Sequence, residues 1–255
     1  MTRKHHEIAV SSNGVATLTI ANAGKANILG SAVIKDLTTA LDALGQDCKL
    51  RAVVLTSPGD KSFVAGADLA EMKDLCPESA RAFIIRLRDL CAAVRNCPVP
   101  VVARINGWCL GGGLELAMAS DFRIAIDHAK FAMPEVKVGI PSVIHAALMP
   151  RLIGAGRARW MLMTGAVINA ETALNWGLID QVAAPGELDD TVTAALAPVL
   201  GCGAGAIRAQ KRLINRWDEV PLSVAIDESI EVFGRAFTTG EPKKAMQAFF
   251  DAKAR

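Results

Sequence analysis

The chain has 255 residues, of which 51% are hydrophobic, and a formal net charge of +2 at pH 7. This composition excludes a disordered protein and a coiled coil, and the length allows one α/β domain with a large buried core. The mixed charges form no basic stripe, and neither a signal peptide nor an apolar run of about 18 residues is present, so we expect a cytoplasmic protein that binds no nucleic acid and no membrane.

Strands and helices are predicted to alternate along the first half of the chain. The turn signal Ser12-Asn13-Gly14 indicates a hairpin between strands at residues 8–10 and 15–20. Further apolar runs predict strands at residues 52–56, 99–105, 122–126 and 131–133, and helical periodicity predicts helices at residues 31–44, 68–75 and 77–94, with a loop over residues 57–66.

The second half is predicted to be helical. This order of elements favours an α/β fold, with a core over residues 1–200 that contains the active site and a helical region over residues 201–255. Apolar residues recur at helical spacing over residues 143–153, 157–163, 170–176, 187–200, 204–217, 222–237 and 243–253.

The cysteines and histidines predict no metal site. None of the six cysteines forms a C-x-x-C pair or stands beside histidines at zinc spacing, so we expect reduced thiols. Among the four histidines, only His145 lies in a stretch that is typical of a functional site.

The run Gly111-Gly112-Gly113 lies where a predicted strand leads into a predicted helix. Glycines leave backbone N–H groups uncovered, and the helix dipole adds partial positive charge at this end. The run therefore predicts a place for an anion or a developing oxyanion.

A second loop, Ala65-Gly66-Ala67, also joins a strand to a helix. Two converging N–H groups, one from each loop, would form an oxyanion hole, which needs small residues because the carbonyl must approach the main chain closely. The alternative for each loop is simple close packing. Neither loop matches a dinucleotide or P-loop motif, so a nucleotide phosphate site is disfavoured.

Two glutamates accompany these loops. Glu115 lies just inside the helix after the glycines, and Glu135 follows Pro134 after a short predicted strand. Each alone could be an exposed residue, Glu115 as a partner of the helix dipole. As a pair they could hold one water molecule, with one as base and the other as acid if their environments separate their pKa values.

The motifs of the chain closely resemble those of the crotonase superfamily, the enoyl-CoA hydratase/isomerase family. The resemblance covers nearly the whole sequence and implies a spiral of repeated β-β-α units with C-terminal helices that assemble as trimers or dimers of trimers. It rests on residues 65–68, 106–107, 111–117, 120–121, 131–135, 150–154, 164–165 and 170–179 in this order and spacing.

The resemblance also implies roles for individual residues. Ala67 and Gly112 would donate their N–H groups to the thioester oxygen, and Glu115 and Glu135 would be the catalytic acid and base. Coenzyme A is part of the substrate, and no cofactor or metal is implied. The residues implied to bind substrate are Ala26, Ala65, Gly66, Asp68, Leu69, Gly111 and Ser142.

The activity that the resemblance implies is the addition of water across the 2,3-double bond of a 2-enoyl-CoA, as in fatty acid metabolism. Glu115 is expected to activate the water and Glu135 to bind it or to protonate Cα, although the pair can share its protons. The alternatives are a double-bond isomerase, another CoA-thioester lyase, hydrolase or decarboxylase of the same fold, and a non-catalytic RNA-binding member.

One stretch departs from the pattern of the family. Residues 139–148 lack paired glycines, so Ile144 and His145 are expected to narrow the acyl pocket. His145 is interpreted either as a partly buried helix residue or as a polar group near the catalytic water. Near the end of the chain, Ala252 stands where a lysine is common, and Lys253 could meet CoA phosphates or remain solvated.

Overall fold

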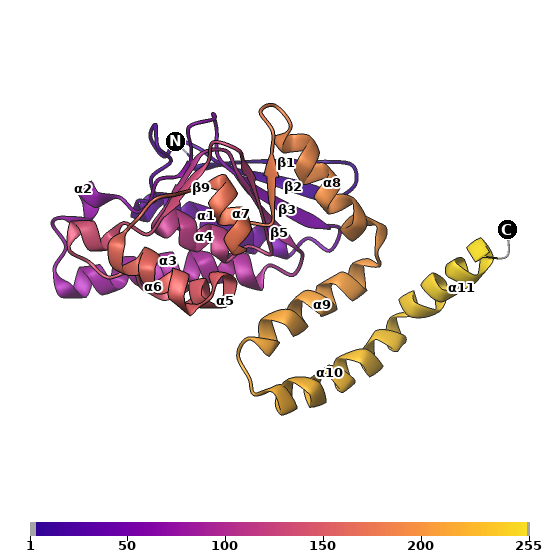
Figure 1. The fold of residues 1–255 in the computed structure, drawn as a ribbon. Coiled ribbons are helices and arrows are strands. Elements are labelled where there is room, and N and C mark those ends of the chain that lie inside the picture. Colours follow the sequence, from indigo (N-terminus) through magenta and orange to yellow (C-terminus); the bar gives the residue numbers. More distant parts are fainter. Residues whose placement is uncertain (1–3, 254–255) are drawn as a thin grey trace.

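A six-stranded sheet and a smaller four-stranded sheet form the centre of the molecule (Figure 1). The structure, a computed structural model, describes residues 4–253. In the larger sheet β1 and β2 form the predicted antiparallel hairpin, and the other neighbouring strands are parallel. Its order is β1 (His6–Val10), β2 (Val15–Ile20), β3 (Ala52–Thr56), β5 (Val101–Ile105), β7 (Phe122–Ile126) and β10 (Gln181–Ala183).

The smaller sheet takes three of its four strands from segments that directly follow strands of the larger one. It consists of β4 (Ser62–Val64), β6 (Trp108–Leu110), β8 (Lys130–Ala132) and β9 (Ile168–Asn169), of which the first three are parallel. The chain thus passes from β3 to β4, from β5 to β6 and from β7 to β8, and each pair leads into a helical segment. This is the repeated β-β-α unit that the family resemblance implies.

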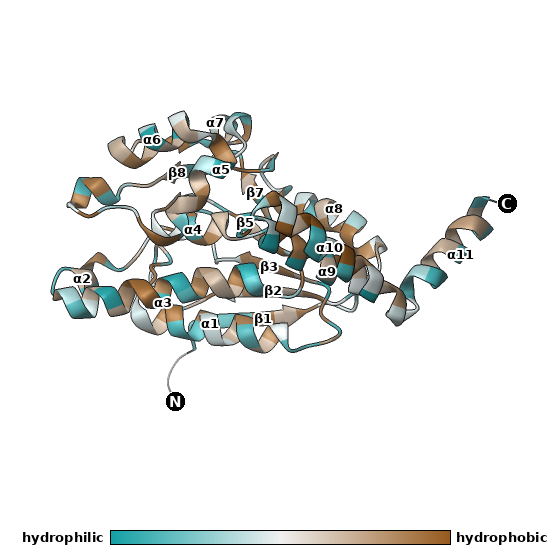
Figure 2. Cartoon of the chain, turned by 90° about the horizontal axis from the view of Figure 1, so that it is seen from below, coloured by the Kyte–Doolittle hydropathy of each residue, from teal (hydrophilic) through white to brown (hydrophobic). Residues whose placement is uncertain are grey.

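Helices cover the sheets and complete the core. The helices α1 and α3 pack side by side (Figure 2), and their buried faces, with Leu37 of α1 and Leu87 of α3, join the apolar strands in one cluster. The helices of this part are α1 (Ser31–Gly45), α2 (Leu69–Met72), α3 (Pro77–Asn96), α4 (Gly112–Met118), α5 (Met149–Ile153), α6 (Ala155–Thr164), α7 (Ala170–Trp176) and α8 (Leu188–Gly201), with 3-10 helices η1 (Glu135–Val138) and η2 (Ile144–Leu148).

The last helices form an arm that extends from the body (Figure 1). The arm consists of α9 (Ala204–Trp217), α10 (Leu222–Ala236), the 3-10 helix η3 (Phe237–Thr239) and α11 (Glu241–Lys253). Its anchor is Lys211 of α9, whose buried ammonium donates to the Asp121 carboxylate at 2.7 Å and to the carbonyls of Val94 and Val99. The arm corresponds to the predicted helical region 201–255, and the ends of the two predicted regions, residues 1–3 and 254–255, lie outside the described residues.

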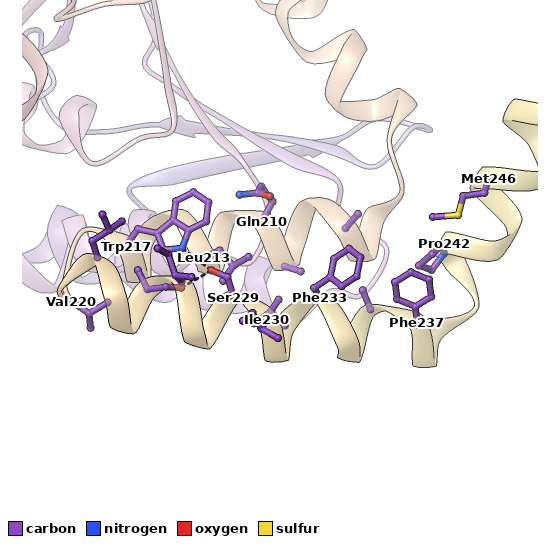
Figure 3. Close-up of a pocket in the computed structure, with 17 residues that line it drawn as sticks. Gln210, Leu213, Trp217, Val220, Ser229, Ile230, Phe233, Phe237, Pro242 and Met246 are labelled. Atoms are coloured by element: carbon purple, nitrogen blue, oxygen red, sulfur yellow. Dashed lines mark hydrogen bonds between the residues drawn. The ribbon is translucent and has the colours of Figure 1, made fainter.

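An apolar groove of about 1050 Å³ runs between α9, α10 and the start of α11 (Figure 3). Large apolar side chains line it, among them Leu222 and Phe233, which are 77% and 68% exposed. One of its few polar contacts is the hydrogen bond from Trp217 Nε1 to Ser229 Oγ at 3.1 Å. The arm therefore presents an uncovered apolar face.

Within residues 4–253, no single helix has the length and apolarity needed to cross a membrane. The helices α8 and α9 are bent by 106° relative to each other, and only the two together have that length and composition.

Three predicted elements differ from the observed ones. The helix expected at residues 143–153 is a 3-10 turn followed by the short α5, because Pro150 cannot donate to an α-helical ladder that continues from the preceding residues. The helix expected at 68–75 is only Leu69–Met72, with Asp68 as its N-cap. The expected loop 57–66 contains β4, which forms through pairing with the distant β6.

Candidate active site

The predicted site residues meet at the carboxyl ends of the parallel strands β4, β6 and β8. The loop after β4 contains Ala67, Gly112 is the first residue of α4, which follows β6, and Glu135 begins the 3-10 helix after β8. Parallel strands end at the same edge, and loops that follow them there commonly carry binding residues. These turns line one cavity of about 390 Å³, which also receives Glu115.

Ala67 and Gly112 are brought together at the wall of this cavity. A Cβ placed on Gly112 would lie 3.9 Å from the Ala67 nitrogen. In the part of the chain that the structure describes, neither N–H donates to a protein acceptor. The neighbouring N–H of Asp68 bonds to the Leu29 carbonyl, so the loop is held while the Ala67 N–H stays available. Two unused, fixed donors are what an oxyanion hole requires.

The three glycines of the β6–α4 turn are required for different reasons. Gly111 has φ 51°, a conformation that favours glycine, and a Cβ there would also collide with Oε1 of Glu135. A Cβ on Gly113 would collide with the Val64 carbonyl oxygen of β4. A Cβ on Gly112 would be too close only to one side-chain methyl group of Leu87, at 2.9 Å, and Gly112, like Gly111, lines the cavity.

Glu115 lies deep in the site, with 3% of its surface exposed. Its Oε1 accepts the N–H of Ala146 at 2.9 Å. The pKa of Glu115 is raised to about 8: burial raises it most, the Ala146 hydrogen bond lowers it, and the charge of Glu135 raises it. This raised pKa favours the protonated form of Glu115 at neutral pH.

Glu135 is only half-buried and has more polar support. Burial raises the pKa of Glu135, whereas its own backbone N–H and the Ser142 hydroxyl lower it. Ser142 Oγ donates to Oε2 at 2.8 Å. The two carboxyl groups therefore occupy different environments, which is the condition for one acid and one base.

A single short segment contacts both glutamates. Ser142 binds Glu135, and four residues later the Ala146 N–H binds Glu115. Between them Ile144 has φ 41°, a left-handed conformation that is costly for a β-branched residue. The strain is held where the chain turns from one carboxyl group to the other.

Most of the predicted substrate-binding residues line the cavity, namely Ala65, Gly66, Asp68, Leu69, Gly111 and Ser142. Asp68 also caps α2, since its carboxylate accepts the N–H groups of Ala70 and Glu71. Ala26 is not among the lining residues, and its carbonyl instead accepts the Ala65 N–H at 3.1 Å. Substrate contact by these residues stays a prediction.

Sequence reasoning missed the apolar wall of the cavity. Phe83, Ile84 and Leu87 of α3 line it, and only their spacing along one helix face could have suggested that they share a surface. It also missed the Ala146 N–H, which carries no sequence signal because every residue but proline has one. The other unpredicted lining residues are Ile28, Ala70, Met72, Pro134, Lys137, Val138, Ile140, Pro141 and Val143.

Ile144 and His145 are not lining residues of the cavity, contrary to the expectation that they narrow the acyl pocket. His145 is half-buried in η2, and burial lowers its pKa, as do the charges of Arg95 and Arg88 on α3. It is thus a partly buried residue beside α3. At the other end, Lys253 lies over the Phe249 ring at 4.8 Å, and its predicted contact with CoA stays a prediction.

Residues 4–253 contain no group of three or more His, Cys, Asp or Glu side chains arranged to hold a metal ion.

Comparisons with known proteins agree with this geometry. The chain is 35% identical over 240 residues to the short-chain-enoyl-CoA hydratase of Clostridium acetobutylicum, covering 94% of this chain and 92% of the relative. It is 37% identical over 228 residues to the crotonyl-CoA hydratase of Syntrophomonas wolfei, with 89% and 88% covered. The crystal structure of an enoyl-CoA hydratase from Mycobacterium smegmatis superposes with a TM-score of 0.94 at 28% identity, with 98% and 97% covered. Residues 10–254 match the enoyl-CoA hydratase/isomerase family, to which this chain belongs.

Proposed function

We propose that the protein is an enoyl-CoA hydratase that adds water across the 2,3-double bond of a 2-enoyl-CoA thioester. The observation that carries the proposal is the convergence of two unused N–H donors, from Ala67 and Gly112, with two carboxyl groups in one cavity. Relatives named for short-chain enoyl-CoA and crotonyl-CoA support a short acyl chain as the first substrate to test.

The proposed reaction follows from where charge develops. When the water oxygen adds to Cβ, electrons move into the thioester and build negative charge on its oxygen. The N–H groups of Ala67 and Gly112 would donate hydrogen bonds to that oxygen, and losing one such donor typically costs about 10²–10³ in rate. One carboxylate takes a proton from the water, and the other carboxyl group delivers its proton to Cα, so that one water is added in total.

The two glutamates are proposed to share a single proton at neutral pH. The pKa of about 8 at Glu115 favours that residue as the carboxylic acid of the resting enzyme, with Glu135 as the carboxylate. This distribution is the reverse of the order expected from the sequence, in which Glu115 activates the water. Because the groups interact, the proton belongs to the pair, and the pH profiles of the two glutamine variants distinguish the two orders.

A double-bond isomerase is the second candidate, because proton transfer between carbons needs only one carboxyl group. Two carboxyl groups in contact with the same cavity favour hydration, which needs one proton taken from the water and one proton delivered to Cα. Activity on 3-enoyl-CoA without hydration of 2-enoyl-CoA would establish the isomerase instead.

The direct test is crotonyl-CoA hydration, followed by the loss of enoyl-thioester absorbance. Glu115→Gln and Glu135→Gln should each lower kcat by about 10²–10⁴. Glu71→Gln is a matched control, since Glu71 binds Ser31 outside the cavity lining. No turnover of short or medium enoyl chains by the unmodified enzyme would refute the hydratase assignment.

We propose further that the chain assembles as a homotrimer or a dimer of trimers through the apolar face of its arm. The occupant of the groove would be a second copy of this chain, since α10 exposes Leu222, Ile230 and Phe233 and the arm extends from its own body (Figure 1). Exposed apolar patches of this size are rare on monomers. A cytoplasmic location and a part in fatty acid metabolism complete the proposal.

Light scattering measures the assembly directly. Phe233→Asp should convert the trimer or hexamer to monomers, because it would bury an unpaired carboxylate in the groove. Asp227→Ala on the same helix is the control, since it removes no apolar contact. A monomeric unmodified protein at micromolar concentration would refute the proposed assembly.

A further inference from the structure

The Glu135 carboxylate is held from two sides. Its Oε2 accepts the Ser142 hydroxyl at 2.8 Å, and its Oε1 packs so closely against Gly111 that no Cβ fits there. Among residues 4–253, Ser142 Oγ has no other hydrogen-bond partner than Glu135. The hydroxyl is therefore committed to this carboxylate in the free enzyme.

We propose that Ser142 is a positioning residue whose hydroxyl fixes the Glu135 carboxylate and keeps it the ionised member of the catalytic pair. This inference rests on the proposed function for its catalytic meaning, although the contact itself does not depend on the substrate. It differs from the role expected from the sequence, in which Ser142 binds substrate.

The physical argument compares the support that each glutamate receives. A hydroxyl can donate to an ionised carboxylate, and such a charge-assisted hydrogen bond is about twice as strong as a neutral one. Glu115 has a single backbone donor, Ala146, and is the more deeply buried residue. The Ser142 hydroxyl thus adds to the difference that separates the two carboxyl groups into acid and base.

The other charged groups around Glu135 do not replace this donor. Glu115 of α4 faces it as the proposed protonated partner, and Asp68 and Lys137 also line the cavity. The helix α6 packs against η1 and carries Arg157 and Arg159, of which Arg157 lies over Trp176 at 5.4 Å. Within the described residues, none of these charged side chains forms a salt bridge with Glu135.

The test is a titration of the Glu135 carboxyl carbon by ¹³C NMR in enzyme labelled at glutamate. The resonance is assigned by its absence in Glu135→Gln. Loss of the donor in Ser142→Ala should raise the midpoint of this titration by about one pH unit, and Ser142→Thr, which keeps a hydroxyl, should restore it. Val136→Ala, an exposed neighbour on η1 outside the lining, is the matched control.

The kinetic consequence separates positioning from substrate binding. Because Glu135 must be ionised, the acidic limb of the kcat profile should move to higher pH in Ser142→Ala, with kcat on that limb lowered by up to about tenfold and KM changed less than about threefold. A rise in KM with an unchanged pH profile would mean that Ser142 binds substrate, and it would overturn the proposal.

The two readouts keep the inference distinct from the proposed function. If the unmodified enzyme hydrates no enoyl-CoA but the Glu135 titration shifts in Ser142→Ala, the function fails and the positioning role stands. If hydration occurs and neither Ser142→Ala nor Ser142→Gly moves the Glu135 midpoint, the positioning role is refuted. Circular dichroism of each variant excludes unfolding as the cause, and Ser142→Gly is used for the titration if Ser142→Ala does not fold.

Discussion

Replacing Gly112 by alanine should remove most of the activity and leave the fold intact. The added Cβ would lie 3.9 Å from the Ala67 nitrogen. It would therefore lie beside the position where both N–H groups are proposed to bind the thioester oxygen. An N–H···O bond needs about 2.9 Å between heavy atoms, so a methyl group there displaces the oxygen from its donors. Loss of one donor typically costs about 10²–10³ in rate, or roughly 3–4 kcal/mol of transition-state stabilisation.

The stability of this variant should change little. The new methyl group meets only the Leu87 Cδ2 atom, at 2.9 Å, and a side-chain end can move by the few tenths of an ångström that are needed. Alanine is also favoured over glycine inside a helix by about 0.5–1 kcal/mol, which offsets the cost of that adjustment. We therefore expect a midpoint of thermal unfolding within about 3 °C of the unmodified protein.

Gly113→Ala provides the contrast that makes the prediction sharp. Its Cβ would collide with the backbone carbonyl of Val64, which cannot move without displacing β4. This variant should lose about 2 kcal/mol of stability or more. Crotonyl-CoA hydration and urea unfolding measure both effects. A Gly112→Ala enzyme with kcat/KM within threefold of the unmodified enzyme would refute the assignment of Gly112 to the oxyanion hole.

Three further predictions concern stability, each measured by urea unfolding. Because the pKa of Glu115 is raised to about 8 in the folded state, the folded state holds a proton that the unfolded state loses above its ordinary pKa. The free energy of unfolding should therefore fall as the pH rises from about 4.5 to 8, and Glu115→Gln should abolish this fall. An equal pH dependence of stability in both proteins would contradict this prediction. Asp68→Ala should cost about 1 kcal/mol by removing the cap of α2, and Asp68→Asn should retain most of it. Lys211→Ala should cost about 3 kcal/mol because Asp121 loses its buried partner, and a loss below about 0.5 kcal/mol would show that the ion pair does not anchor the arm.

Local patterns predicted much of the fold. The strand at 52–56 and the helix at 204–217 have the predicted bounds, because apolar alternation and helical periodicity are properties of neighbouring residues. The three-residue strand β4 was not predictable in this way, because it exists through its pairing with β6. Very short strands carry too few side chains for a period to be visible.

The residue types predicted the chemistry of the site, but they did not predict which carboxyl group holds the proton. Small residues at 67 and 112 and the glutamates at 115 and 135 indicated an oxyanion hole with an acid and a base, since that chemistry requires N–H groups free of side chains and two carboxyl groups. Which carboxyl group holds the proton depends on burial and on donors from elsewhere in the chain. The Ala146 N–H, the Ser142 hydroxyl and the depth of Glu115 arise only when η2 and α3 pack around α4, because desolvation and hydrogen-bond direction are properties of the assembled neighbours.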